Sequence, residues 1–209
     1  SSDNISMIPY GGIPCQTCIS DLHYISAIDS RLKSRNFFVV IARPEPENSI
    51  LEIVASFSSI DRDDIYLVVL GNIVDTDNDY HSLIINSASG NVIFPGSIYS
   101  SKIISSLRSH ALAYIHGHTV GGTNPSLVEA LAASSAVIAH DNRFNQWVAS
   151  SSALYFSSNV ELKLRISHLI DNPQIASQYR VRAFERYLES FTWEKIFITS
   201  TSLFTSFDV

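Results

Sequence analysis

The sequence lacks the features that mark several common classes of protein. Its 209 residues carry a formal net charge of −6 and its pI is near 5.6, so it offers no concentrated basic surface for a nucleic-acid backbone. No apolar run approaches the roughly eighteen residues of a membrane span, and residues 1–4 lack the basic and apolar regions of a signal peptide. We therefore expect a cytoplasmic chain with no transmembrane segment and no nucleic-acid partner.

Familiar cofactor and catalytic motifs are also missing. The first apolar run, residues 37–42, is not followed by G-x-G-x-x-G, and G-x-x-x-x-G-K-[ST] occurs nowhere. These absences argue against a dinucleotide dehydrogenase and a P-loop NTPase. Cysteine is limited to Cys15 and Cys18, a single C-x-x-C with His23 nearby. A zinc site needs more ligands, which leaves a labile disulfide or two ordinary thiols, and we expect no metal and no cofactor.

Hydrophobic residues make up 45% of the chain and charged residues only 16%, which is typical of one globular domain with a large core. Apolar runs alternate with segments of helical periodicity. The expected strands are residues 37–42, 65–70, 92–94, 111–115, 136–139 and 154–156, and the expected helices are residues 50–57, 78–88, 103–109, 125–134, 159–171, 174–190 and one after Thr192. This alternation predicts an α/β fold with a Rossmann-like parallel sheet, helices on both faces, and ligands beyond the carboxyl ends of the strands.

Residues 116–136 look like a phosphate-binding turn that leads into a helix. Gly121 and Gly122 permit a positive φ or a close approach of the backbone to a ligand. Asn124 suits the helix N-cap, and Pro125 suits the first helical position, where a missing N–H costs nothing. The sequence therefore predicts a helix that begins at residue 125.

The start of that helix favours an anion. We expect the amides of Ser126 and Leu127 to be unpaired and, with the partial positive charge of the helix end, to attract a pyrophosphate. The Ser126 hydroxyl adds to the site. One turn further on, the Glu129 carboxylate should reach the rim of the same pocket, where ribose hydroxyls are suitable donors. The alternative is that Glu129 only complements the helix dipole.

Two other segments follow strands at the same edge of the sheet. Arg43 can pair with phosphate oxygens, or it can form a surface ion pair with a neighbouring glutamate. Gly96, Ser97 and Ile98 can present backbone groups to a base, or they can form only a turn. His118 lies beside the glycine turn, although a structural role is the commoner one for a histidine.

Four motifs follow one another along the chain. They are Arg43…Glu47-Asn48, Val92-Ile93-Phe94-Pro95-Gly96, Gly122-Thr123-Asn124-Pro125-Ser126-Leu127-Val128-Glu129-Ala130-Leu131-Ala132 and Ser190-Phe191-Thr192-Trp193-Glu194. Their order and spacing resemble the C-terminal half of family 4 retaining glycosyltransferases of the GT-B fold, over most of residues 37–197. Within that family, residues 118–126 and 140–145 look most like bacterial polysaccharide rhamnosyltransferases.

The resemblance implies a site for a nucleoside-diphosphate sugar, a UDP- or dTDP-sugar. Glu129 would bind the ribose hydroxyls, Arg43 would neutralise the diphosphate, and residues 96–98 would lie against the base. The turn and the helix start would hold the sugar and the diphosphate, through Gly121, Gly122, Thr123, Asn124, Ser126 and Leu127. The implied reaction is transfer of a hexose, with retained configuration, to a saccharide or lipid-linked acceptor in bacterial polysaccharide biosynthesis.

Three positions depart from the family pattern. The first glutamate of its E-x7-E motif is Gly121 here, and the lysine five residues after Arg43 is Asn48. The usual Cys-Gly-x-Pro after the helix appears as Ala-Ser-Ser-Ala at residues 133–136. With two charged side chains lost, diphosphate neutralisation would rest more heavily on Arg43 and the helix dipole, and His118 is a candidate for a replacing sugar or phosphate contact.

The resemblance also divides the chain. Residues 1–36 would form a linker and the start of the domain, residues 37–190 the nucleotide-sugar-binding domain, and residues 191–209 a helix that crosses back to an acceptor-binding N-terminal domain. We expect one half of a GT-B enzyme, which binds nucleotide but shows little transfer alone. A lipid-linked acceptor would bring it to the inner face of the plasma membrane. The alternatives are a sugar-nucleotide epimerase or hydrolase of the same fold and a non-catalytic interaction domain.

Overall fold

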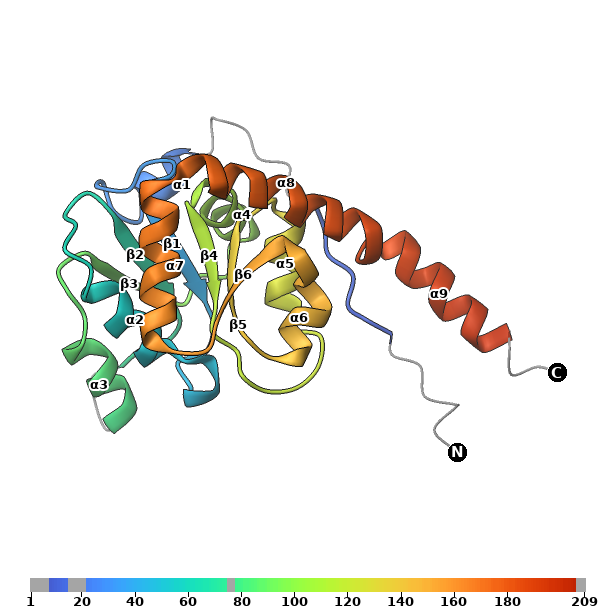
Figure 1. Ribbon diagram of the computed structural model, residues 1–209, viewed down its shortest axis with the longest axis horizontal. Helices are drawn as coiled ribbons and strands as arrows, with labels where there is room; N and C mark the ends of the chain where they lie inside the picture. Colours follow the sequence, from blue (N-terminus) through green and yellow to red (C-terminus); the bar gives the residue numbers. More distant parts are fainter. Residues whose placement is uncertain (1–7, 15–21, 75–77, 206–209) are drawn as a thin grey trace.

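The computed structural model describes residues 8–14, 22–74 and 78–205. Its centre is a six-stranded parallel sheet in the order β3-β2-β1-β4-β5-β6 (Figure 1). The strands are β1 (Phe37–Ile41), β2 (Tyr66–Leu70), β3 (Val92–Gly96), β4 (Ala113–His116), β5 (Val137–His140) and β6 (Ala153–Phe156). This order confirms the expected Rossmann-like α/β sheet, with its topological switch point between β1 and β4.

Helices cover both faces of the sheet (Figure 1). They are α1 (Leu22–Ser26), α2 (Ile50–Ser58), α3 (Asp79–Asn86), α4 (Ser101–His110), α5 (Pro125–Ala132), α6 (Arg143–Ala149), α7 (Asn159–Asp171), α8 (Pro173–Ser190) and α9 (Trp193–Thr205). Two short 3-10 helices span Pro46–Asn48 and Ser150–Ser152. Helices α1, α4, α5, α6 and the second half of α8 bury side chains on one face, and α2, α3, α7 and the start of α8 do so on the other.

The first strand is apolar on both of its faces. Successive residues of a strand point to opposite sides. Phe37 and Val39 therefore join the core that includes α4 and α5, whereas Phe38 and Val40 join the core that includes α2 and α7. All four are at most 2% exposed, and burial of each contributes about 1.5–3 kcal/mol. The central strand thus joins two hydrophobic cores into one domain.

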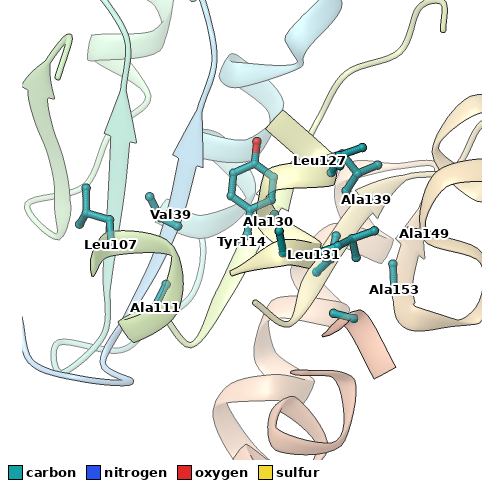
Figure 2. Close-up of a cluster of buried hydrophobic side chains, with 14 of the residues drawn as sticks. Val39, Leu107, Ala111, Tyr114, Leu127, Ala130, Leu131, Ala139, Ala149 and Ala153 are labelled. Atoms are coloured by element: carbon teal, nitrogen blue, oxygen red, sulfur yellow. The ribbon is translucent and has the colours of Figure 1, made fainter. Parts of the chain in front are cut away.

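Small side chains let α5 lie close to the sheet. Figure 2 shows Leu127, Ala130 and Leu131 of this helix in the same buried cluster as Tyr114 of β4 and Ala139 of β5. All three helix residues are fully buried, so a larger side chain at Ala130 would force the helix away from the strands. This packing fixes the N-terminus of α5 at the carboxyl edge of the sheet.

The expected elements are present, with shifted ends. The strand expected at residues 111–115 runs from Ala113 to His116, and α8 already begins at Pro173. Two helices, α1 and α6, were not expected. In α6 the buried set includes the polar Asn145, whose amide nitrogen bonds the carbonyls of His118 and His140. A short helix that buries an asparagine in this way shows no apolar period in its sequence.

The N-terminal segment lies beside the end of α8. Gly12 N donates to Phe191 O at 2.8 Å, and the Tyr187 hydroxyl donates to Gly12 O at 3.2 Å. Beyond this point α9 extends away from the sheet (Figure 1). Among the described helices, none combines the length and the apolar character needed to cross a bilayer.

Candidate functional site

Loops that follow β1 and β4 meet at the carboxyl edge of the sheet. The amide and the hydroxyl of Thr119 both donate to Glu47 O, at 2.8 and 3.1 Å, and the Ser49 hydroxyl donates to Gly117 O at 2.9 Å. A Cβ on Gly117 would lie 2.3 Å from Asn48 O. Only glycine therefore permits the two loops to approach this closely at the topological switch point.

Asn48 connects the predicted residues Arg43 and His118. Its side-chain nitrogen donates to Arg43 O at 2.9 Å, and its Oδ1 lies 2.8 Å from His118 Nδ1. Because Oδ1 can only accept, His118 carries its proton on Nδ1. Burial lowers the pKa of His118, and the positive charge of Arg43 adds to this effect, whereas Glu47 opposes it. Asn48, expected only as a lost lysine, thus orients His118.

The loop after β5 supports the same histidine from the other side. Asn142 Nδ2 and Asn145 Nδ2 both donate to His118 O, at 3.0 and 2.9 Å. Asn142 also caps α6 through the amides of residues 144 and 145. His118 is therefore held by loops that follow β1 and β5.

The start of α5 differs in one respect from the expectation. Asn124 is the N-cap and Pro125 the first helical residue, as predicted. The amides of Ser126 and Leu127 are, however, not unpaired: Asn124 Oδ1 accepts from Ser126 N at 2.9 Å, and Asn124 O accepts from Leu127 N at 3.1 Å. The cap residue itself occupies the donors that were expected to bind an anion, so only the dipole of the helix end is left to favour one.

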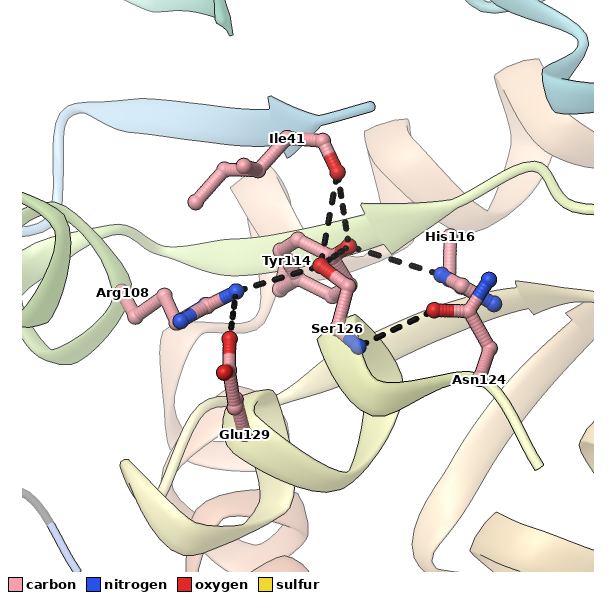
Figure 3. A network of polar contacts seen from close by, with 7 residues as sticks. All are labelled: Ile41, Arg108, Tyr114, His116, Asn124, Ser126 and Glu129. Carbon is pink, nitrogen blue, oxygen red and sulfur yellow. Dashed lines mark hydrogen bonds and ion pairs between the residues drawn. The ribbon is translucent and has the colours of Figure 1, made fainter. Parts of the chain in front are cut away.

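The Ser126 hydroxyl belongs to a buried network (Figure 3). It lies 2.7 Å from the Tyr114 hydroxyl, 3.1 Å from Arg108 Nη2 and 3.3 Å from Ile41 O. Burial raises the pKa of Tyr114, so its phenol stays protonated and donates a hydrogen bond. The network joins the ends of β1 and β4 to the first turn of α5.

Glu129 pairs with an arginine that the sequence did not single out. Arg108 Nη2 lies 2.7 Å from Glu129 Oε2 (Figure 3), and the arginine side chain is 7% exposed whereas that of Glu129 is 50% exposed. Glu129 therefore does more than complement the helix dipole. Arg108 is the last-turn residue of a largely polar helix, and nothing in its local sequence distinguishes a buried arginine from a solvated one.

Glu129 also lies on the wall of a cavity of about 850 Å³. Lys102 and Arg108 of α4 and Trp193 of α9 are on the same wall. The remaining lining residues come mainly from the N-terminal segment and the start of α4 and include Tyr10, Gly11, Gly12, Ile13, Pro14, Tyr24, Tyr99, Ser101, Ile104 and Ser105. Residues 96–98 do not line this cavity, although Tyr99 directly follows them.

The backbone of the predicted base and sugar segments has the conformations that glycine favours. Gly96, Gly121 and Gly122 adopt φ values of 79°, 36° and 71°, which strain any residue with a Cβ. Ser97 is exposed and Ile98 packs partly against the core.

Thr123 is partly buried in the turn, and the side chain of Leu127 is fully buried. Leu127 therefore offers no side chain to a ligand, and its N–H already donates to Asn124 O. Arg43 forms no ion pair with any described residue, so the alternative of a surface ion pair is not observed. Its guanidinium remains available to an anion at the carboxyl edge.

In the part of the chain that the structure describes, no group of three or more His, Cys, Asp and Glu side chains could hold a metal ion. Cys15 and Cys18 lie outside the described residues, so the choice between a disulfide and free thiols stays a prediction.

The strand order and the interlocked loops at the switch point define a Rossmann-like domain. The family of glycosyl transferases group 1 matches residues 26–186, and the chain belongs to that family. Among curated proteins, none matches the sequence significantly.

Solved structures agree with this fold. Sucrose-phosphate synthase from Thermosynechococcus elongatus superimposes with a TM-score of 0.79 at 18% identity, over 97% of this chain and 52% of that one. A glycosyltransferase from Rickettsia africae gives a TM-score of 0.83 at 13% identity, over 99% and 58%. The HepE protein of Anabaena, in complex with UDP and glucose, gives 0.77 at 16% identity, over 93% and 55%. The chain thus spans about half the length of each of these structures.

Proposed function

We propose that the chain is the donor-binding domain of a retaining glycosyltransferase. The parent enzyme transfers a hexose from a nucleoside-diphosphate sugar to a saccharide or lipid-linked acceptor, with retained anomeric configuration. The observation that carries the proposal is the arrangement of polar groups after the strands that flank the switch point. Arg43, which has no ion pair among the described residues, follows β1, and the N-terminus of α5 with the half-exposed Glu129 follows β4. A GT-B neighbour holds UDP and glucose, which supports a nucleotide-sugar donor.

Each group has a role that suits its chemistry. Arg43 binds the diphosphate, and the α5 dipole stabilises the charge that develops on the leaving nucleotide, so no metal is required. Glu129 accepts hydrogen bonds from ribose hydroxyls, and residues 96–98 contact the base. His118, whose Nδ1 proton is held by Asn48, offers Nε2 as an acceptor to a sugar hydroxyl, and it would donate to a phosphate only with the imidazole protonated.

The acceptor is bound by a second domain. The matched structures are nearly twice as long as this chain, which is consistent with an acceptor-binding partner domain that α9 reaches. By its resemblance to rhamnosyltransferases, the enzyme uses dTDP-rhamnose in bacterial polysaccharide biosynthesis. It works in the cytoplasm, at the inner face of the plasma membrane when the acceptor is lipid-linked.

A thermal-shift titration with UDP, dTDP, GDP and ADP tests donor binding. A nucleotide at a hundredfold excess over its Kd stabilises the folded chain by about 2.7 kcal/mol, which raises the unfolding midpoint by several degrees. Arg43→Ala should abolish the shift, and Glu129→Ala should reduce it by about half if the ribose contacts contribute about tenfold to the affinity. The matched controls are Arg182→Ala and Glu185→Ala, both exposed on α8, and they should leave it unchanged.

One observation favours a second candidate, a non-catalytic interaction domain. The family's first glutamate is Gly121, and the remaining one already pairs with Arg108. If this candidate is correct, none of the four nucleotides shifts the midpoint at millimolar concentration. A shift that neither site substitution reduces would instead refute the roles of Arg43 and Glu129.

A further inference from the structure

Arg108 is a buried cation whose side chain contacts the proposed ribose-binding residue. It lies in the last turn of α4, yet both of its polar side-chain partners, Ser126 and Glu129, belong to the first turns of α5 (Figure 3). Its guanidinium also lies 5.9 Å from the centre of the Tyr114 ring. The side chain therefore crosses from α4 to α5 at the wall of the cavity.

The ion pair is a costly way to stabilise a fold. Removing a guanidinium from water carries a large desolvation penalty, which a single partner rarely repays, and a well-packed apolar side chain often stabilises a protein as well or better. Here the penalty is only partly offset, because Arg108 Nε is buried without a hydrogen-bond partner among the described residues. The arrangement is better explained by what it does to Glu129.

A half-exposed glutamate on a helix surface samples several rotamers. Arg108 restricts that freedom, because its Nη2 forms an ion pair with Oε2 of the carboxylate at 2.7 Å. The same nitrogen bonds the Ser126 hydroxyl at 3.1 Å, three residues earlier on the helix. The carboxylate is thereby fixed relative to the N-terminus of α5, and no other described residue engages Oε1.

We propose that Arg108 is a positioning residue that orients Glu129 for the ribose of the donor. The proposal rests on the proposed function, since it requires a nucleotide whose sugar hydroxyls reach Glu129. Arg108 lines the same cavity, but its side chain is 7% exposed against 50% for Glu129, so it acts mainly through the glutamate. An oriented carboxylate accepts the ribose hydroxyls without first losing rotamer entropy, which strengthens binding of a nucleotide that has those hydroxyls and leaves one that lacks them unaffected.

The experiment compares UDP with 2′,3′-dideoxy-UDP, or dTDP with its 3′-deoxy form where thymidine is the preferred base, by calorimetric titration of the whole chain. The wild type should prefer the hydroxylated nucleotide by at least about tenfold. Glu129→Gln and Arg108→Met should each reduce this preference to nearly one. The double variant should show no further loss, because both changes remove the same interaction.

The ratio of the affinities for the hydroxylated and the deoxy nucleotide distinguishes a loss of stability from a loss of ribose binding. A purely structural role for Arg108 would weaken both nucleotides equally and leave the ratio unchanged, which would overturn the proposal. Arg108→Lys keeps a cation near Glu129 without the guanidinium fork, so it should fold and recover part of the preference. Arg182→Met, an exposed control on α8, should behave as the wild type.

The outcomes also distinguish this proposal from the proposed function. If the wild type and Glu129→Gln differ as expected but Arg108→Met retains the full preference, the positioning role is wrong and donor binding stands. If no nucleotide binds the wild type, the proposed function fails and the role of Arg108 fails with it.

Discussion

His116 is a histidine that the fold keeps neutral. It ends β4, is 4% exposed, and its Nε2 is buried with no hydrogen-bond partner among the described residues. Burial lowers its pKa from 6.5 to about 3, and the nearby charges of His118, Arg108 and His140 act in the same direction. Protonation therefore competes directly with folding at this position.

We predict an acid-dependent loss of stability that His116→Asn removes. The folded-state pKa is depressed, so the unfolded chain binds the proton more tightly between pH 6.5 and about 3. Neutral His116 makes its full contribution to the free energy of unfolding above pH 6.5, and this contribution is lost as the pH falls towards 3. Urea unfolding at pH 7 and pH 4 should show that the wild type loses about 3 kcal/mol more than His116→Asn. Equal losses in the two proteins would contradict the burial argument, and His168→Asn, at an exposed site on α7, is the control.

At the scale of single residues, the sequence named candidates whose roles stay predictions, and it did not reveal the contacts that connect them. Glu129, Arg43 and His118 were selected because residue type, position and the family resemblance together suggest a nucleotide-sugar site. The pairing of Glu129 with Arg108 could not be predicted, since the two residues belong to different helices and an arginine in a polar segment gives no sign of burial. The role of Asn48 was hidden for the same reason: its partners are a carbonyl and a distant histidine.

At the scale of single elements, the C-terminus of α5 has a common capping motif that contains one strained residue. Ser134 N donates to Leu131 O and Ser135 N donates to Ala130 O, both at 3.0 Å, which is the pattern of a Schellman motif. Ser134 has a φ of 52°, a conformation that glycine adopts without strain. In the family that the sequence resembles, the glycine of the Cys-Gly-x-Pro motif stands at this position.

Ser134→Gly should therefore stabilise the protein. Relief of the left-handed strain outweighs the extra entropy of glycine in the unfolded chain, and we expect the free energy of unfolding to rise by up to about 1 kcal/mol. Ser177→Gly, in the exposed interior of α8, is the matched control and should lower it by about 0.5 kcal/mol. Denaturant unfolding of the two variants measures both effects, and a loss at residue 134 would refute the interpretation.

The sequence predicted secondary structure well for strands that are buried on both faces of the sheet. Buried parallel strands such as β1 and β2 appear in sequence as continuous apolar runs, and most of the helices have an apolar period or a recognisable cap. The missed element α6 has its buried face partly made by Asn145, which serves hydrogen bonding rather than the core. The sequence thus failed to predict a helix whose buried asparagine bonds neighbouring loops instead of filling the hydrophobic core.

At the scale of the whole molecule, the N-terminal segment and α9 are coupled through a glycine. A Cβ on Gly11 would lie 2.6 Å from the Trp193 ring, and the neighbouring Gly12 pairs with Thr192. The segments that would lead to and from a partner domain therefore lie against each other.

Gly11→Ala should displace Trp193. In a Trp147→Phe background Trp193 is the sole tryptophan, and its emission should move to longer wavelength as the ring becomes more exposed. We expect a loss of about 1–3 kcal/mol in unfolding free energy, because the contact is overpacked. At Gly90 a Cβ would meet nothing within 4 Å, so Gly90→Ala should change neither property. Unchanged emission in Gly11→Ala would contradict the contact.

The bonds that join residues 47–49 to residues 117–119 have a consequence for the order of folding. Their partners are separated by 68 to 72 positions in the chain, so the loop-closure entropy of the central crossover must be overcome before any of them can form. The candidate site therefore assembles late, after β1 and β4 have paired. A nascent chain that ends before β4 has no such site, so the nucleotide binding proposed above would report that the crossover is complete.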